Sequence, residues 1–148
     1  MAGEAAFVDT NALVYANQEN SPHHELAREQ LRRLRAEGCI LWLSRQVLRE
    51  YLAVVTRDYG SGPALPLPRA TSRVRQLAQL FEVAEDGPEV TTRLLQLVEQ
   101  YPTAGRQVHD DNIVATMLAH RMTRLLTFNG ADFRRFVPLI ILEPLAAP

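Results

Sequence analysis

The sequence contains no lysine, a single cysteine and no long apolar run. All 16 of its basic residues are arginine, and 17 acidic residues leave a net charge of −1. This balance does not by itself predict a nucleic-acid partner, because domains that bind nucleic acid through overall charge are strongly basic. No stretch approaches the roughly 18 apolar residues of a membrane span, and residues 1–7 lack the basic start and apolar core of a secretory signal. We therefore expect no membrane contact and a location in the cytoplasm.

The single cysteine, Cys39, has no second thiol with which to form an internal disulfide. It precedes the apolar run at residues 40–43, so we expect a small buried side chain in a reducing compartment. The chain has 148 residues, of which 47% are hydrophobic and 22% charged. These values are typical of one packed domain, which we expect to span residues 1–148.

Arginines cluster in two parts of the sequence. The clusters are Arg28, Arg32, Arg33 and Arg35, and then Arg69, Arg73 and Arg75. A guanidinium group is a planar donor that can contact phosphate through two hydrogen bonds. Charged clusters at helical spacing are nevertheless most often solvated helix faces, and we interpret both clusters in this way.

Short apolar segments alternate with longer helical patterns along the whole chain. The predicted strands are residues 5–8, 40–43, 81–84, 125–127 and 139–142. The predicted helices are residues 12–16, 21–37, 44 to about 60, 70–80, 88–101, 109–122 and a short one at 132–136. Residues 58–68 contain two glycines and three prolines and predict an irregular loop.

This alternation predicts an α/β fold, a three-layer α/β/α sandwich around a mainly parallel central sheet. Functional sites in such sheets lie beyond the carboxyl ends of the strands. That rule selects Asp9, which follows the first strand, and the loop at residues 127–132, which follows a later one.

Asp110 is an acidic residue in apolar company. A 3.6-residue repeat places it in line with Ile113, Val114 and Met117 on the buried stripe of a helix. A buried carboxylate needs a partner or a cation, although a helix cap or a favourable contact with the helix dipole explains the position equally well. Asp111 lies about 100° further round the helix, and we expect it either to face solvent or to contact the acids of the site without binding the metal itself.

Three other acidic residues each have an ordinary explanation. Asp9 is a plausible helix cap, Glu50 is a plausible surface residue at the margin of an apolar helix face, and Asp132 is a plausible cap of the short helix at Phe133. These explanations do not account for the four acids as a set. The acids occur at the start of the first helix, in the middle of the third helix, at the head of a late helix and in the loop after the next strand.

Four segments carry a resemblance to a known family. They are Phe-Val-Asp-Thr-Asn at residues 7–11, Ser-Arg-Gln-Val-Leu-Arg-Glu at 44–50, His-Asp-Asp-Asn-Ile-Val-Ala at 109–115 and Leu-Thr-Phe-Asn-Gly-Ala-Asp-Phe at 126–133. In their order and spacing they resemble the PIN domain family and, within it, the VapC-type toxins of bacterial toxin–antitoxin pairs.

The resemblance implies a catalytic cluster and its polar neighbours. The implied acids are Asp9, Glu50, Asp110 and Asp132, and the implied supporting residues are Thr127, Asn129 and Asp111. Asp111 departs from the family pattern, in which a small residue follows the third acid. Asp110 is preferred over Asp111 as the third acid because it precedes Ala115 by five residues, as the pattern requires, and lies on the apolar stripe.

The implied activity is endoribonuclease cleavage with Mg²⁺ or Mn²⁺, because crowded carboxylates without His or Cys favour hard cations. Asp9, Asp110 and Asp132 would be the metal ligands, with Glu50 acting through water. An RNA substrate, a cognate antitoxin of a type II pair and a homodimer are the expected partners.

Two alternatives stay open. One is a catalytically silent PIN-like domain that binds RNA or protein. The other is a phosphatase with Asp9 as nucleophile, although that class needs a second aspartate where Asn11 stands, and no lysine is present to balance a phosphorylated aspartate.

Overall fold

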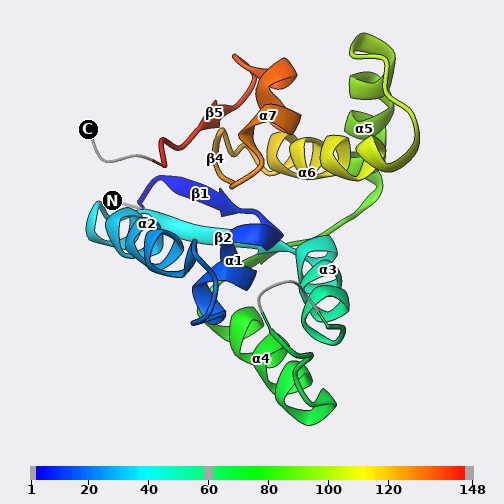
Figure 1. Ribbon diagram of the computed structural model, residues 1–148. Coiled ribbons are helices and arrows are strands. Elements are labelled where there is room, and N and C mark those ends of the chain that lie inside the picture. Colours follow the sequence, from blue (N-terminus) through cyan, green and yellow to red (C-terminus); the bar gives the residue numbers. More distant parts are fainter. Residues whose placement is uncertain (1–2, 59–61, 146–148) are drawn as a thin grey trace.

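Five parallel strands form one sheet, in the order β3-β2-β1-β4-β5 (Figure 1). The computed structural model describes residues 3–58 and 62–145. The strands are β1 at Ala5–Val8, β2 at Ile40–Ser44, β3 at Glu82–Ala84, β4 at Arg124–Leu126 and β5 at Ile141–Leu142. Every pairing between neighbouring strands is parallel, which confirms the predicted sheet.

Helices cover both faces of this sheet (Figure 1). On one side lie α1 at Thr10–Asn17, α2 at His24–Ala36, α3 at Arg45–Val55 and α4 at Leu67–Leu80. On the other side lie α5 at Pro88–Gln100, the short 3₁₀ turn η1 at Gly105–Gln107, α6 at Val108–Ala119, α7 at Gly130–Phe133 and a second 3₁₀ turn, η2, at Arg134–Phe136. The predicted three-layer α/β/α sandwich is therefore confirmed. No described helix has the length and apolar character needed to cross a membrane.

The central strand β1 explains the unbroken apolar run at residues 5–8. Ala6, Phe7 and Val8 are all fully buried, because helices cover both faces of the sheet and strands flank β1 on both sides. A strand buried on both faces has no solvent side on which polar residues would alternate. The chain therefore becomes polar only where β1 ends, at Asp9.

The strand order creates a switch point beside β1. The chain runs from β1 outward through β2 to β3, and then returns to the opposite side of β1 to form β4 and β5. The backbone N–H of Asp9 donates to the carbonyl of Leu126 over 2.9 Å. The carboxyl ends of β1 and β4 therefore lie side by side, which is where ligands bind in open α/β sheets.

Several predicted boundaries differ from the structure. The second helix begins at His24, because the hydroxyl of Ser21 accepts from the backbone N–H of His23 at 3.1 Å in the preceding turn. The third helix ends at Val55; its predicted end near Gly60 lies outside the described residues. The last strand spans only Ile141–Leu142 and not residues 139–142, because the N–H of Ile140 turns back to the carbonyl of Phe136 at 3.2 Å.

Candidate active site

Asp9 sits at the junction of β1 and α1, where it caps the helix. Its Oδ1 accepts from the backbone N–H of Thr10 at 2.8 Å, as expected of an N-cap residue. Its Oδ2 accepts from the hydroxyl of Thr127 at 2.8 Å, across the switch point between β1 and β4. The side chain is only 6% exposed. The cap explains the position of the backbone, and the contact with Thr127 fixes the direction of the carboxylate.

Asn11 ties the loop after β4 to the start of α1. Its Oδ1 accepts from the N–H of Phe128 at 3.0 Å, and its Nδ2 donates to Oδ2 of Asp9 at 3.3 Å. The hydroxyl of Thr127 also accepts from the N–H of Asn129 at 3.0 Å. Thr127 and Asn129, both expected near the acids, are therefore held there by side-chain and backbone contacts.

Glu50 faces Asp9 from α3. Its Oε2 accepts from the hydroxyl of Thr10 at 3.0 Å, and its Oε1 accepts from Nε2 of Gln46 at 2.7 Å. The side chain is half-buried and does not belong to the open surface. The surface interpretation of Glu50 is therefore wrong, because α3 turns this margin of its apolar face toward the start of α1.

Sequence reasoning missed Gln46, which connects α3 to α6. This buried side chain donates through Nε2 to the carbonyl of His109 at 2.8 Å, and its Oε1 accepts from Nδ2 of Asn112 at 2.8 Å. Gln46 precedes Glu50 by four residues, and that helical spacing between a buried amide and a carboxylate is the signal that could have found it. The two hydrogen bonds of Gln46 to His109 and Asn112 fix α3 against the first turn of α6.

Asp110 and Asp111 are neighbours in the first turn of α6, and only the position of Asp111 differs from the prediction. Asp110 is half-buried and lines the cleft between α6 and α3. Of the two positions expected for Asp111, the solvent-facing one is wrong, because the side chain is fully buried and accepts a hydrogen bond from Arg135 of η2. The prediction failed because it assumed one buried stripe, whereas α6 lies between the sheet and α5 and buries residues on most of its circumference.

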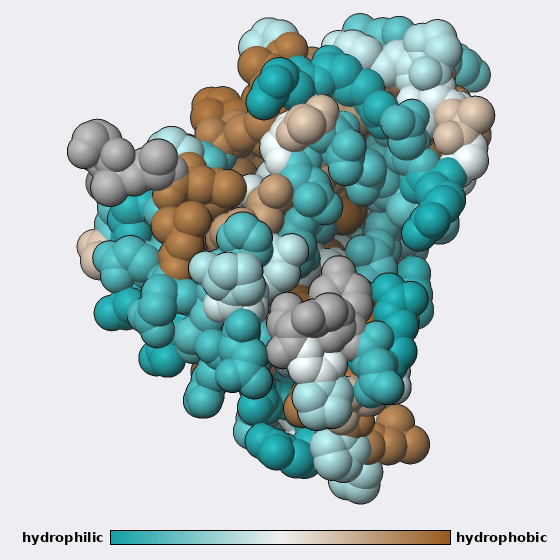
Figure 2. Space-filling model, viewed as in Figure 1, coloured by the Kyte–Doolittle hydropathy of each residue, from teal (hydrophilic) through white to brown (hydrophobic). Residues whose placement is uncertain are grey.

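The four predicted acids line two adjoining cavities. Asp9, Glu50 and Asp110 line a cavity of about 310 Å³, and Glu50, Asp110 and Asp132 line a neighbouring cleft of about 620 Å³. The surface over α3 and α6 is largely hydrophilic (Figure 2). Asp132 is exposed within α7, whose N-cap is Asn129, so the prediction that Asp132 caps this helix is wrong.

Two residues that were not expected in the site also line these cavities. Arg106 of η1 lines both of them, and His109 lines the larger. Arg106 lies in a connecting segment without periodicity, so nothing in the sequence pattern pointed to it. His109 lies in the first turn of α6, and its side chain is exposed at the cleft wall.

Crowding and burial make two of these carboxyls hard to ionise. Burial raises the pKa of Asp9 to about 6, against the hydrogen bonds from Thr127 and Thr10 that lower it, and the charges of Glu50 and Asp110 raise it further. Burial also raises the pKa of Asp110 to about 6, with the charges of Asp132 and Glu50 contributing next. The acids therefore repel one another across a shared space.

The donor chemistry of the site fits a hard divalent cation. The acids and the Thr and Asn side chains near them offer oxygen ligands, and a cation between the carboxylates would relieve the repulsion that raises the two pKa values. In the described ranges, no group of three His, Cys, Asp or Glu side chains is already arranged to hold a metal ion. Binding would therefore require the carboxylates to converge by side-chain movement.

The fold and site define an α/β domain with carboxylates gathered at the switch point of a parallel sheet. The model of the PIN domain family matches residues 6–137, and the chain belongs to this family. The resemblance seen in the four sequence segments is therefore confirmed. The comparison with curated proteins found no match.

Several solved structures share the fold. VapBC2 from Rickettsia felis, bound to a DNA fragment from its promoter, is 23% identical with a TM-score of 0.68, covering 94% of this chain and 97% of that chain. A toxin–antitoxin complex from Klebsiella pneumoniae is 20% identical with a TM-score of 0.68, covering 97% and 99%. VapC20 from Mycobacterium tuberculosis, a toxin that cleaves the sarcin–ricin loop, is 17% identical with a TM-score of 0.65, covering 88% and 94%.

The raised pKa of Asp9 predicts how stability depends on pH. In the metal-free protein, folded Asp9 keeps its proton up to about pH 6, whereas the unfolded chain releases it near 3.8. The free energy of unfolding should therefore fall as the pH rises through this window. Asp9→Asn removes the titration while preserving the cap, so its stability relative to wild type should rise by on the order of 3 kcal/mol between pH 4 and pH 7. Urea unfolding in EDTA at several pH values measures the difference, and a pH-independent difference would contradict the prediction.

The buried pair of Asp111 and Arg135 should contribute to stability as a unit. Asp111 is fully buried and Arg135 half-buried. Arg135→Met strands a buried carboxylate and should lower the free energy of unfolding by about 3 kcal/mol, whereas Asp111→Asn leaves a partly solvated guanidinium and should cost less. The double variant should lose clearly less than the sum. The neighbouring exposed Arg134→Met serves as the control and should have little effect. Additive losses in urea unfolding would show that the two side chains do not stabilise each other.

Proposed function

We propose that this chain is an endoribonuclease that uses Mg²⁺ or Mn²⁺ and acts as the toxin of a type II toxin–antitoxin pair. The observation that carries the proposal is the shared cavity lined by Asp9, Glu50 and Asp110, which come from three elements far apart in the sequence. Membership of the PIN domain family and the fold shared with toxin–antitoxin proteins support it. The sarcin–ricin loop cleaved by VapC20 is an RNA, which favours RNA as the substrate class.

The roles that we propose for the acids are those that the resemblance to the PIN domain family implies. Asp9, Asp110 and Asp132 would hold the cation, and Glu50 would act through water or help to deprotonate it. When bound, one or two divalent ions would supply a more acidic water and neutralise charge on the phosphodiester. Thr127 and Asn11 keep the Asp9 carboxylate turned toward the cavity.

Glu50 is oriented before any substrate binds. Thr10 and Gln46 donate to its two oxygens at 3.0 and 2.7 Å, so both oxygens are fixed and the carboxylate needs little reorganisation to accept a proton. The Thr127 hydroxyl already donates to Asp9, which leaves the side chain of Asn129 at the cavity wall as the better candidate for contact with a phosphate or a water.

Arginine at the cleft wall would receive the substrate. Arg106 lines both cavities, and Arg49 lines the larger one. A guanidinium group there would contact phosphate and offset the repulsion between RNA and the acids. A cognate antitoxin that covers this cleft, a homodimer and a cytoplasmic location belong to the same proposal.

Replacement of Asp9 tests the activity directly. Asp9→Asn should abolish Mg²⁺-dependent cleavage of RNA, because it removes the central carboxylate while keeping the helix cap. Cleavage of total RNA by wild type and variant, with and without EDTA, gives the readout, and circular dichroism checks the fold. Cleavage that persists in EDTA, or that is retained in the Asp9→Asn variant, would contradict the proposal.

One observation favours the alternative of a catalytically silent PIN domain. Among the described residues, no three acids already form a metal-binding group. Calorimetric titration with Mn²⁺ separates the two functions: we expect binding at millimolar metal or tighter that Asp110→Asn weakens at least tenfold. Absence of heat at millimolar Mn²⁺ would favour the silent domain.

The phosphatase alternative gains no support. Asn11 occupies the place of the second aspartate, and it is engaged in holding the N–H of Phe128 and the carboxylate of Asp9.

A further inference from the structure

A second, basic pocket lies next to the acid-lined cleft. It has a volume of about 360 Å³ and lies between the end of α1, α3 and α4. Arg57, Arg69 and Arg73 line it, and Glu19 is the acidic side chain among its lining residues. Among the described lining residues the arginines outnumber the acidic side chain, even without counting Arg57, and this excess of positive charge favours an anionic ligand. Arg69 and Arg73 belong to a cluster that the sequence suggested was only a solvated helix face.

Tyr51 provides a neutral donor at the inner wall of this pocket. The side chain is fully buried and lines the pocket wall, and its hydroxyl oxygen accepts from Nδ2 of Asn17 at 3.2 Å, with the charge of Arg73 nearby. Burial raises the pKa of Tyr51 more than the neighbouring Arg73 lowers it, so the hydroxyl keeps its proton. The contact with Asn17 uses the oxygen as an acceptor, so the O–H can serve as a donor to a ligand that reaches this wall of the pocket.

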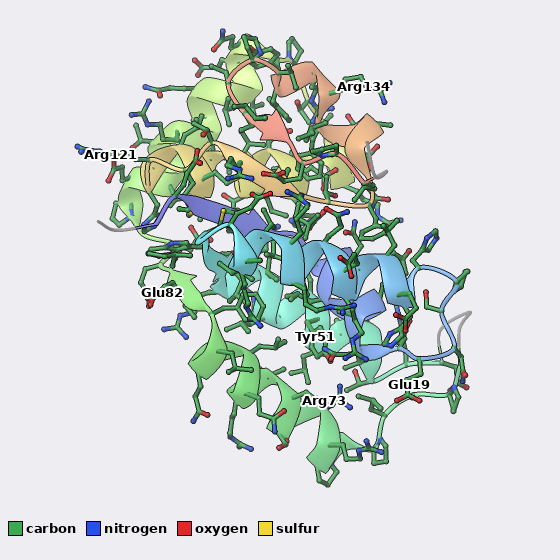
Figure 3. The ribbon with its side chains drawn as sticks, turned by 90° about the vertical axis from the view of Figure 1, so that its left-hand side faces the viewer. Glu19, Tyr51, Arg73, Glu82, Arg121 and Arg134 are labelled. Carbon is green, nitrogen blue, oxygen red and sulfur yellow. The ribbon has the colours of Figure 1, made fainter. Side chains whose placement is uncertain are left out.

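Arg73 is directed toward Tyr51 from α4. Figure 3 shows Tyr51, Arg73 and Glu19 on the same side of the molecule, away from Arg121 and Arg134. Arg73 is half-buried and Arg69 is exposed, and within the described part of the chain neither forms an ion pair. Their charges are therefore available to a ligand that enters from solvent.

The basic pocket adjoins the acid-lined cleft at Arg57. Glu50, Val54 and Arg57 follow one another at spacings of four and three residues, which places them along one face of α3 and the turn that extends it. Glu50 and Val54 line the cleft, and Arg57 lines both the cleft and the basic pocket. A chain-like ligand bound in the cleft can therefore extend past Arg57 into the pocket.

We propose that this pocket binds a backbone phosphate of the RNA strand at a point beyond the cleavage site. Arg69 and Arg73 would neutralise the phosphate, and the Tyr51 hydroxyl would donate to one of its oxygens. The inference rests on the proposed ribonuclease function and deepens it, because it assigns part of the substrate affinity to α4. RNA is favoured over an acidic protein segment because the pocket adjoins the cleft that would hold the scissile phosphodiester.

Equilibrium binding of single-stranded RNA tests the pocket without requiring cleavage. All proteins carry Asp9→Asn and are measured in Mg²⁺ by fluorescence anisotropy across a range of salt concentrations. Arg69→Gln/Arg73→Gln should weaken binding about tenfold at low salt and reduce the slope of log K against log salt by about 1.4, since each phosphate contact on a single strand contributes about 0.7.

The control variant matches the change in net charge. Arg75 lies two residues beyond Arg73, on the opposite side of α4, and Arg93 lies exposed on α5. Arg75→Gln/Arg93→Gln should leave the slope within about 0.3 of the Asp9→Asn parent. An equal loss in both double variants would overturn the proposal by showing a general charge effect.

Further outcomes separate the pocket from its surroundings. Because Arg73 contacts Tyr51, its replacement could disturb the pocket wall. Arg69→Gln alone leaves that contact intact and should still lower the slope by about 0.7. Unchanged RNA affinity in folded variants would overturn the proposal, as would competition by hexaglutamate as strong as that by RNA of equal charge. If wild type cleaves no RNA but these binding differences appear, the ribonuclease function fails and the phosphate pocket stands.

Discussion

The burial of β1 between β2 and β4 is the constraint on which the rest of this structure depends. Because both faces and both edges of the strand are covered, its side chains must be apolar until the chain leaves the sheet. The first polar side chain, Asp9, therefore emerges at the switch point, where the N–H of Asp9 pairs with Leu126. The sheet therefore places the carboxylate of Asp9 beside the loop that follows β4.

The packing of α3 against α6 brings Glu50 and Asp110 to the same switch point, and polar contacts between the two helices stabilise that packing. Gln46 links Glu50 to the backbone of His109 and the amide of Asn112, so α3 and the first turn of α6 keep a fixed separation. Buried polar groups of this kind are tolerated only when their hydrogen bonds are satisfied. The other carboxylates are close enough to raise the pKa values of Asp9 and Asp110, and hydrogen bonds hold Asp9 and Glu50 in place.

Much of the architecture could be predicted because hydrophobic period and strand-end chemistry are local properties. The strand at Ala5–Val8 was predicted with its observed bounds, and the Ser44 cap of α3 is present, with its hydroxyl accepting from Val47 at 3.3 Å. Which acids face a common space could be proposed from order and spacing, although their roles as catalysts and ligands stay predictions.

The failures share a physical cause, which is that tertiary contacts override a local pattern. Asp111 was expected at the surface because helical periodicity supposes one buried side, whereas α6 is enclosed by both the sheet and α5. Arg106 and Gln46 belong to the site only because separate elements converge there. Such convergence leaves little trace in a single sequence, apart from the four-residue spacing of Gln46 and Glu50.

The pair of Asp111 and Arg135 has a consequence for how this site can move. Arg135 follows Asp132 by three residues, and its bond to Asp111 fastens the segment after β4 to the helix that presents Asp110. Swinging that segment away would strand a fully buried carboxylate without its counter-ion. The backbone frame around the acids is therefore stiff, and any gathering of oxygens about a cation falls to side-chain torsions. Such a frame would discriminate between cations by size more than a hinged one would, because its walls cannot follow a larger ion.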